Sequence, residues 1–168
     1  MRPEIVVCRL GVDDVAPYRD LRLLGLKTEP AAFGGAFEEA QDQPDTYWRQ
    51  ALQSNRLHYG AFAGEKLVGI ANFEQFHGQK LKHRAGVYGV FVHPDFGGMG
   101  IGVQLLTRIA DDARARGITQ LHLGVGVDNK PARRLYSKLG FEPYGHEPSA
   151  IRLADRDIDE LLMIKFLA

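Results

Sequence analysis

The first half of the chain alternates between strand-like and helix-like patterns of apolar and polar residues. Ile5 to Leu10 is an apolar, β-branched run and predicts a short first strand. Asp13 is the expected N-cap of a helix that runs to about Lys27 and ends at the turn-prone segment 28–30. Pro44 then opens a second helix, whose apolar residues are Tyr47, Trp48, Ala51 and Leu52.

The middle of the chain predicts three strands. Leu57–Ala63 and Leu67–Gln75 are joined by Gly64-Glu65-Lys66, which is a hairpin signal. Val87–His93 is strongly β-prone, and Pro94 ends it because proline cannot donate to a strand ladder.

The second half adds two helices and three strands. Residues 102–116 follow a helical pattern, with Leu106, Ile109, Ala110 and Ala113 on one face, and Gly117 ends this helix. The remaining expected elements are a strand, a helix and two further strands, at Leu121–Val127, Pro131–Leu139, Ile151–Leu153 and Leu161–Phe166. Strands and helices in this order predict an α/β sheet covered on both faces.

The composition is that of one globular domain, residues 1–168. Lys plus Arg and Asp plus Glu number 21 each, so the chain lacks the basic excess of a nucleic-acid-binding protein. No run reaches the roughly 18 apolar residues of a membrane span. The first apolar run is also too short for the core of a signal peptide. We therefore expect a cytoplasmic protein with no nucleic-acid or membrane partner.

The cysteine and histidine residues indicate neither a disulfide nor a metal site. Cys8 is the only cysteine, and we interpret it as a small buried hydrophobic residue rather than a nucleophile. The six histidines do not show the spacing of metal ligands, so we expect no metal.

The most informative segment is residues 90–102, which read VFVHPDFGGMGIG. A predicted strand ends there, a loop with four glycines follows, and an amphipathic helix begins at once. This arrangement directs free backbone amides toward one point at a helix N-terminus, where the helix dipole favours an anion. Glycine allows a pyrophosphate to approach the backbone closely and allows positive φ where it is needed.

Other interpretations of this loop fit less well. A Walker A loop needs Lys and then Ser or Thr after its last glycine, but Val103 and Gln104 follow Gly102. A dinucleotide fingerprint needs G-x-G-x-x-G and an acid about 20 residues later. Here Gly98, Gly100 and Gly102 give G-x-G-x-G, and residues 120–123 contain no acid. A flexible turn without a ligand is the remaining alternative.

Two segments resemble the GNAT superfamily of N-acetyltransferases. The first is the strand, Val-x-Pro and glycine loop, in which Gly100 and Gly102 occupy the two small positions of the family's motif. The second is residues 127–141, VDNKPARRLYSKLGF, in which Asn, Ala, Tyr and Gly-Phe recur at the family's intervals. The resemblance covers about residues 57–144. It implies a mixed, mostly antiparallel central sheet of about seven strands, flanked by about four helices.

The resemblance also implies acetyl-CoA as cosubstrate. The implied contacts are the loop amides for the pyrophosphate, the strand backbone for the pantetheine arm, Asn129 for that arm and Tyr136 for the departing thiolate. The expected coenzyme-binding residues are Phe91, Val92, Gly97, Gly98, Met99, Gly100, Ile101, Gly102, Val103, Asn129 and Tyr136.

The chemistry independently suits Tyr136. The thiol that leaves has a free pKa of about 8.5 and departs as an anion, to which a phenol of pKa near 10 can donate a proton or hydrogen bond. The competing interpretation is that Ala132, Leu135, Tyr136 and Leu139 form an ordinary apolar helix face.

The chain departs from the family pattern at two points. Gly97 stands where relatives carry Gln or Arg, and Met99 stands where many carry a basic residue, so the loop has no cation of its own. Many relatives also carry a Glu just before the loop, and Val87-Tyr88-Gly89-Val90 has none. Glu74 and His83 are the candidate bases, with a solvated surface role as the alternative for each.

The acceptor site is less defined. Phe33 and Tyr88 are the candidate substrate-binding residues, and the acids Glu38, Glu39, Asp42 and Asp45 could attract a cationic amine or simply be solvated at a helix start.

The resulting hypothesis is an N-acetyltransferase that moves acetyl from acetyl-CoA directly to a primary amine of a small molecule or peptide. A polyamine, an antibiotic, an amino acid and a protein N-terminus all remain open as acceptors. The alternatives are a non-catalytic acyl-CoA-binding or sensing module and a nucleotide-binding protein. Edge strands near the C-terminus allow a homodimer.

Overall fold

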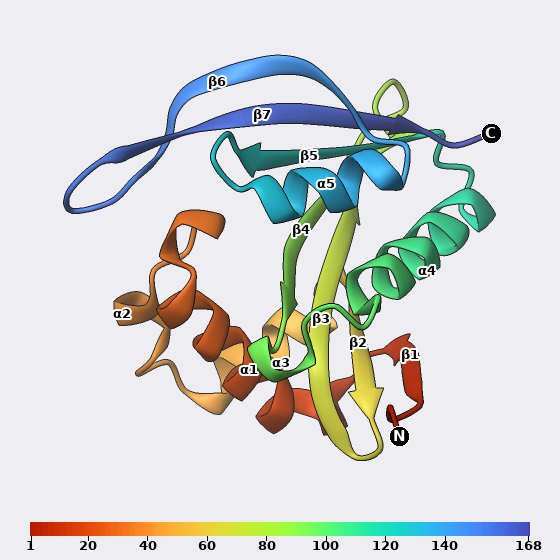
Figure 1. Ribbon diagram of the computed structural model, residues 1–168. Coiled ribbons are helices and arrows are strands. Elements are labelled where there is room, and N and C mark those ends of the chain that lie inside the picture. Colours follow the sequence, from red (N-terminus) through yellow and green to blue (C-terminus); the bar gives the residue numbers. More distant parts are fainter.

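A computed structural model describes all residues, 1–168, and shows one seven-stranded sheet with helices on both faces (Figure 1). The strand order is β1-β2-β3-β4-β5-β7-β6, and every neighbouring pair is antiparallel except β4 and β5. The strands are β1 (Ile5–Arg9), β2 (Leu57–Ala63), β3 (Lys66–Gln75), β4 (Arg84–Val92), β5 (Gln120–Gly126), β6 (Glu142–Arg152) and β7 (Asp157–Phe166). The helices are α1 (Val15–Thr28), α2 (Phe37–Ala40), α3 (Asp45–Gln53), α4 (Ile101–Ala115) and α5 (Lys130–Lys138), with 3-10 turns at Val12–Asp14, Pro30–Ala32 and Pro94–Phe96.

The predicted fold class is confirmed, and among the strands the differences lie at the ends of the elements. β4 begins at Arg84 rather than at Val87. β6 covers Glu142–Arg152, much more than the expected Ile151–Leu153. This strand contains Pro143 and Pro148 and lies at the edge of the sheet, where proline costs no central ladder bond.

The helix predictions also need two corrections. The short α2 was not expected, because four residues are too few to show a helical period. Asp13 is not the cap of α1: residues 12–14 form a 3-10 turn, and the carboxylate of Asp14 accepts a hydrogen bond from the amide of Gly11 at 2.8 Å.

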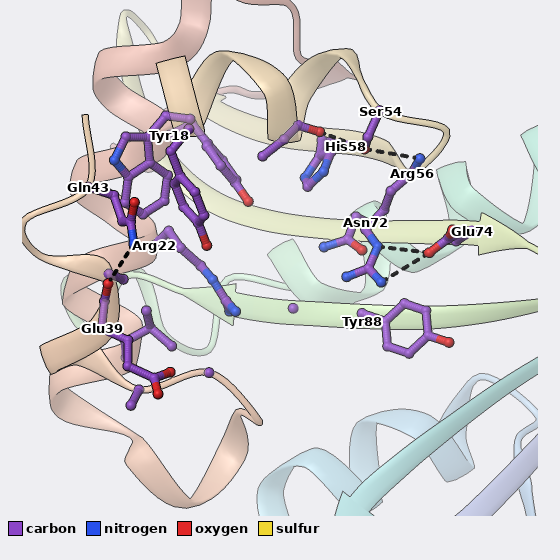
Figure 2. Close-up of a pocket in the computed structure, with 18 residues that line it drawn as sticks. Tyr18, Arg22, Glu39, Gln43, Ser54, Arg56, His58, Asn72, Glu74 and Tyr88 are labelled. Atoms are coloured by element: carbon purple, nitrogen blue, oxygen red, sulfur yellow. Dashed lines mark hydrogen bonds and ion pairs between the residues drawn. The ribbon is translucent and has the colours of Figure 1, made fainter. Parts of the chain in front are cut away.

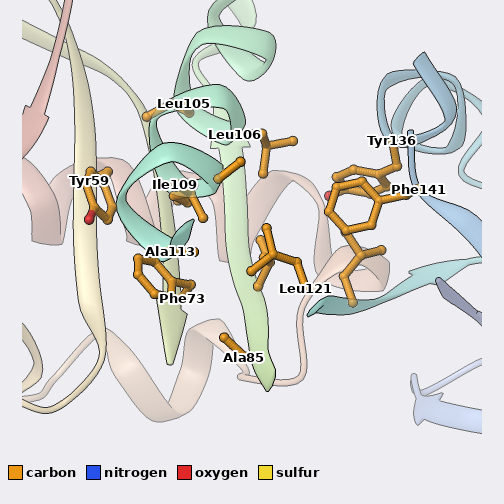
Figure 3. Close-up of a cluster of buried hydrophobic side chains, with 14 of the residues drawn as sticks. Tyr59, Phe73, Ala85, Leu105, Leu106, Ile109, Ala113, Leu121, Tyr136 and Phe141 are labelled. Atoms are coloured by element: carbon orange, nitrogen blue, oxygen red, sulfur yellow. The ribbon is translucent and has the colours of Figure 1, made fainter. Parts of the chain in front are cut away.

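Two apolar clusters cover the two faces of the sheet. Figure 3 shows α4 residues such as Leu105 and Ile109 packed against Tyr59 and Phe73, and all four are almost fully buried. The second cluster joins residues of α1 and α3 to Phe91 and others of the sheet's opposite face. Burial on both faces therefore fixes the positions of α1, α3 and α4 relative to β3 and β4.

The parallel pair β4–β5 opens the sheet near its centre. Pairing is confined to Arg84–Gly86 against Gln120–His122, and the two strands then separate (Figure 1). β4 also bulges against β3: Tyr88 pairs with Asn72 and Phe91 with Ile70, so Gly89 and Val90 together oppose Ala71. Gly89 has φ of +61°, which favours glycine. The bulge and the separated strands leave one edge of β4 without a strand partner.

None of the helices combines the length and the apolar character that a membrane crossing would need.

Candidate functional site

The glycine loop connects the end of β4 to the N-terminus of α4. Gly98 and Gly100 have φ of +73° and +75°, in the left-handed region where a side chain is strained. Gly100 is the N-cap of α4, and its carbonyl accepts the first helical hydrogen bond, from the amide of Gln104 at 3.1 Å. These two glycines therefore turn the chain directly from the strand into the helix.

Backbone amides at this turn have no acceptor within the protein. The free amides are those of Gly98, Met99, Gly100, Ile101, Gly102 and Val103. Successive free amides at the start of a 15-residue helix form an anion site. Gly97 differs, because its amide donates to the carbonyl of Pro94 at 3.2 Å, so the free amides begin at Gly98.

The side chains around the loop point into the protein. Phe96 and Met99 pack against the core cluster under α4, so neither offers charge to a phosphate. At Gly102, an added Cβ would lie 2.8 Å from a methyl carbon of Leu135, so glycine lets α4 approach α5 closely. The positive potential at the loop therefore comes from backbone amides and the helix dipole rather than from a charged side chain of the loop.

The open edge of β4 continues from the loop. The amide of His93 donates to the carbonyl of Val68 on β3 at 2.8 Å, and strand alternation then turns the backbone of Phe91 toward β3 as well. The amide and carbonyl of Val92 face the opposite, unpaired side. Of the two predicted strand contacts, Val92 therefore has the backbone groups that are free for a ligand.

Tyr136 lies on α5 with a buried ring and a hydroxyl that has no hydrogen-bond partner in the protein. Its ring packs edge-to-face on Phe141 at 5.8 Å. Burial raises the pKa of the Tyr136 phenol, and the nearby Glu160 and Glu29 raise this pKa further. The phenol therefore stays protonated at neutral pH and can act as a donor.

Asn129 caps α5. Its side-chain oxygen accepts a hydrogen bond from the amide of Ala132 at 3.3 Å, which is the ordinary role of asparagine at a helix start. This cap fixes the start of α5 and so helps to position Tyr136 two turns later.

A cavity of about 850 Å³ lies between α1, α3 and the strands β2, β3 and β4 (Figure 2). Tyr88 and Gly89, at the bulge of β4, form part of its wall. The cavity therefore adjoins the same strand whose free edge leads to the glycine loop. Its size suits a small molecule or the end of a peptide.

The sequence pattern of the acetyltransferase (GNAT) family matches residues 25–141, which is more than half of the chain. The chain belongs to this family. An N-alpha-acetyltransferase, RimI, from Mycobacterium tuberculosis is 33% identical over 115 residues, covering 68% of this chain and 70% of that protein. An uncharacterized N-acetyltransferase from Methanocaldococcus jannaschii is 45% identical over 58 residues, which are 34% of this chain and only 26% of that protein.

Solved structures show the same fold. A GNAT acetyltransferase from Streptococcus pneumoniae superposes with a TM-score of 0.85 at 24% identity, covering 98% of this chain and 100% of that one. A putative acetyltransferase from Salmonella typhimurium, solved with its cofactor acetyl-CoA, has a TM-score of 0.81 at 19% identity and covers 98% and 95%. The predicted resemblance to the GNAT superfamily is confirmed. The prediction that the protein is an acetyltransferase is confirmed as well, as a property of the family to which it belongs.

Within this GNAT fold, two of the predicted acceptor-site residues line the cavity. Glu74 accepts hydrogen bonds from Nε and Nη2 of Arg56 at 3.2 and 3.0 Å. The same guanidinium lies 4.5 Å from the centre of the Tyr88 ring. Arg56 thus holds a carboxylate and an aromatic ring side by side on the cavity wall (Figure 2).

Phe33 and His83 do not line the cavity. Phe33 is buried in the core, where its ring packs on Phe91 at 6.2 Å and under the guanidinium of Arg22 at 4.7 Å. His83 is exposed beside the paired start of β4, where its carbonyl accepts from the amide of Thr119. Gly89 is roughly 20 Å further along the strand, so His83 is not a candidate base.

Two further expectations change. Cys8 is half-buried rather than buried. Burial, and after it the negative charge of Asp14, raises the pKa of its thiol, which opposes a nucleophilic role. Of the predicted acidic group, only Glu39 lines the cavity, whereas Asp45 pairs with Arg19 at 3.1 Å on the surface.

Sequence reasoning missed the polar residues that α1 and β3 bring to the cavity. Arg22 lies four residues after Tyr18 and four before Leu26, within the buried stripe of α1, and an arginine there is a signal that could have been noticed. Asn72 is likewise a polar residue within the buried, otherwise apolar run of β3.

Proposed function

We propose that this protein transfers the acetyl group of acetyl-CoA directly to a primary amine of a small molecule or peptide, with both substrates bound at once. The observation that carries the proposal is the row of free amides at the start of α4, next to the unpaired edge of β4. Acetyl-CoA supplies an acetyl thioester, and the amine displaces coenzyme A as a thiol.

The loop and strand suit the coenzyme in different ways. The amides from Gly98 to Val103 would hold the pyrophosphate through hydrogen bonds and the dipole of α4. The free amide and carbonyl of Val92 would pair with the amide groups of the pantetheine arm as an added strand does. Both sets of contacts use backbone groups, which explains how the site exists without the usual loop cation.

Tyr136 would assist departure of the thiol. Its hydroxyl has no partner in the protein, and its raised pKa keeps the proton on the phenol. A hydrogen bond to sulfur becomes stronger as negative charge develops there, so this contact favours the transition state over the ground state.

Glu74 is the proposed proton acceptor for the amine, directly or through water. We expect Glu74→Gln to lower turnover about tenfold at neutral pH. This is below the usual 10²–10⁴-fold range, because Arg56 already engages the carboxylate and water can take the proton instead. Initial rates measured as pH rises should converge with those of the native protein, because the amine then loses its proton without help. A rate deficit that is equal at all pH values would exclude Glu74 as the base.

Substitutions at Gly97 test whether a charge in the loop strengthens coenzyme A binding. Its φ is −61°, and an added Cβ would meet only the Pro94 carbonyl at 3.5 Å, an ordinary contact. Gly97→Ala should therefore leave coenzyme A affinity unchanged. Gly97→Arg should tighten it a few-fold, about 0.2–1 kcal/mol, with a steeper salt dependence. Titration calorimetry at two salt concentrations measures both effects, and weakening by alanine would show that the backbone here needs glycine.

A thiol-release assay with acetyl-CoA and a panel of amines tests the proposed function. We expect release that requires both an amine and the enzyme, with the acetylated amine as product. Tight binding of coenzyme A without any acetylated product would instead support an acyl-CoA-binding module. A larger thermal shift with ATP or NAD than with coenzyme A would indicate a nucleotide-binding protein.

A further inference from the structure

Unsatisfied buried polar atoms are gathered at one place in this protein. Four buried side-chain atoms have no hydrogen-bond partner: Arg22 Nη1, Trp48 Nε1, His58 Nε2 and Asn72 Oδ1. All four residues line the same 850 Å³ cavity, although they come from α1, α3, β2 and β3 (Figure 2). Buried polar groups are normally paired, so such a convergence indicates a polar ligand.

Arg22 is the cation in this group, and it has no carboxylate partner. The other arginine of the cavity, Arg56, is already paired with Glu74 at 3.0 Å. Arg22 stacks on the face of Phe33 at 4.7 Å, which fixes the guanidinium plane but leaves its in-plane N–H donors free. Arg22 is half-buried, and its Nη1 is fully buried without a partner. Burying such a charged donor unpaired is costly, and a bound anion would remove that cost.

Arg22 and Asn72 meet at the bulge of β4. A Cβ built on Gly89 would lie 2.7 Å from Asn72 Nδ2 and 3.7 Å from Arg22 Nη1. This places both side chains beside the strand whose free edge we assign to the thioester arm. A ligand held by Arg22 would therefore lie next to the reacting acetyl group.

Trp48 and His58 carry the other unpaired atoms on the α3 and β2 side of the cavity. The ring of Tyr18 packs edge-to-face against both of their rings, with ring-centre distances of 6.1 and 5.2 Å. The indole N–H of Trp48 can only donate. Burial, with Arg56 and Arg22 nearby, lowers the pKa of His58 to about 4, so its ring is neutral at physiological pH. The cavity thus combines two donors, on Arg22 and Trp48, with a neutral imidazole and a side-chain amide.

We infer that the acceptor amine also carries a carboxylate, and that this carboxylate binds Arg22 Nη1 and Trp48 Nε1. Free amino acids are the simplest compounds of this class. The amine of the same molecule would then face Asn72 Oδ1 and His58 Nε2, which can accept its N–H groups. This inference rests on the proposed function and specifies its substrate class. The carboxylate satisfies the only unpaired cation on the cavity wall.

Matched amines test the inference with the native enzyme. Each amino acid of a panel is compared with its carboxamide and with the amine that remains after removal of the carboxylate, in the thiol-release assay. We expect kcat/KM for the preferred amino acid to exceed that of both analogues by at least about tenfold, the loss typical of one charged contact. Equal or faster acetylation of the carboxylate-free analogues, or of peptide N-termini, would overturn the inference and leave the proposed function intact.

Variants locate the contact. Arg22→Gln should abolish the preference for the carboxylate, mainly through KM, and Trp48→Phe should reduce it. Arg49→Gln is the matched control, because Arg49 is exposed on α3 and lies outside the cavity wall. A normal thermal shift with coenzyme A shows that each variant is folded. A preference that survives in folded Arg22→Gln would overturn the assignment of Arg22.

A binding measurement separates failure of this inference from failure of the proposed function. If no amine releases thiol, titration of the native protein with the same amino acids and analogues still reports on the cavity. Binding of the amino acid alone, lost in Arg22→Gln, would support the carboxylate site without turnover. Equal binding of all three compounds, or none by any of them, would contradict it.

Discussion

Removing the hydroxyl of Tyr136, in Tyr136→Phe, should lower kcat by about 10²–10⁴-fold while leaving coenzyme A affinity nearly unchanged. The hydroxyl has no partner within the protein, so its loss leaves no unpaired group behind. The ring packs on Phe141, and phenylalanine retains this contact. The effect should therefore fall on the step in which charge develops on sulfur, and single-turnover kinetics with saturating amine measure that step.

Tyr144→Phe is the matched control for Tyr136→Phe. Tyr144 is exposed on β6, so the same chemical change there should not alter kcat. Unchanged single-turnover rates in Tyr136→Phe would show that Tyr136 only packs on the apolar face of α5. A large rise in the dissociation constant of coenzyme A would instead place the hydroxyl in ground-state binding.

Gly100→Val should abolish the stabilisation of the protein by coenzyme A. At about 100 times its dissociation constant, the ligand should raise the free energy of unfolding of the native protein by about 2.7 kcal/mol. Gly100 is the N-cap of α4 with φ of +75°, so a β-branched side chain would distort the turn that aligns the free amides. Denaturant titrations with and without coenzyme A measure this difference.

Gly117→Val separates loss of the site from general strain. Gly117 has nearly the same φ, +76°, with no atoms near its Cβ direction, but it follows the opposite end of α4. Both substitutions should cost about 1–3 kcal/mol of stability, and only Gly100→Val should lose the coenzyme effect. Equal retention of the effect in both variants would place the coenzyme elsewhere.

The geometry of the glycine loop could be predicted from the sequence because it is local. Gly98 and Gly100 are residues that adopt positive φ without strain. The amides next to them are free because the first amides of a helix such as α4 have no acceptor within it. Asn129 was predicted from the family motif as a contact of the coenzyme arm, and the structure shows in addition that its side-chain oxygen caps α5.

The 850 Å³ cavity could not be predicted in the same way, because its residues come from distant segments. Arg22 and Asn72 both lie beside Gly89 only because α1 packs on the face of the sheet where β4 bulges. The bulge depends on Gly89, which the sequence presents as one glycine inside a strand. Phe33 was predicted to touch the substrate, but its apolar ring is buried beneath the guanidinium of Arg22.

The full length of edge strand β6 could not be predicted either, for a different reason. Its prolines and polar residues obscure the alternation that identifies a strand, and its pairing with β7 alone keeps it in the sheet. Central strands such as β3, which are buried on both faces, were predicted nearly to the residue.

The most direct test of the account follows the acetyl group itself. The enzyme is incubated with isotopically labelled acetyl-CoA and the preferred amine from the panel, and carbon NMR follows the labelled carbonyl while intact-protein mass spectrometry follows the chain. The account predicts that the label passes from thioester to amide only when the amine is present, and that the protein, including its single thiol at Cys8, never carries it. Label on the protein, or a thioester that remains intact with every amine while coenzyme A binds, would contradict direct transfer.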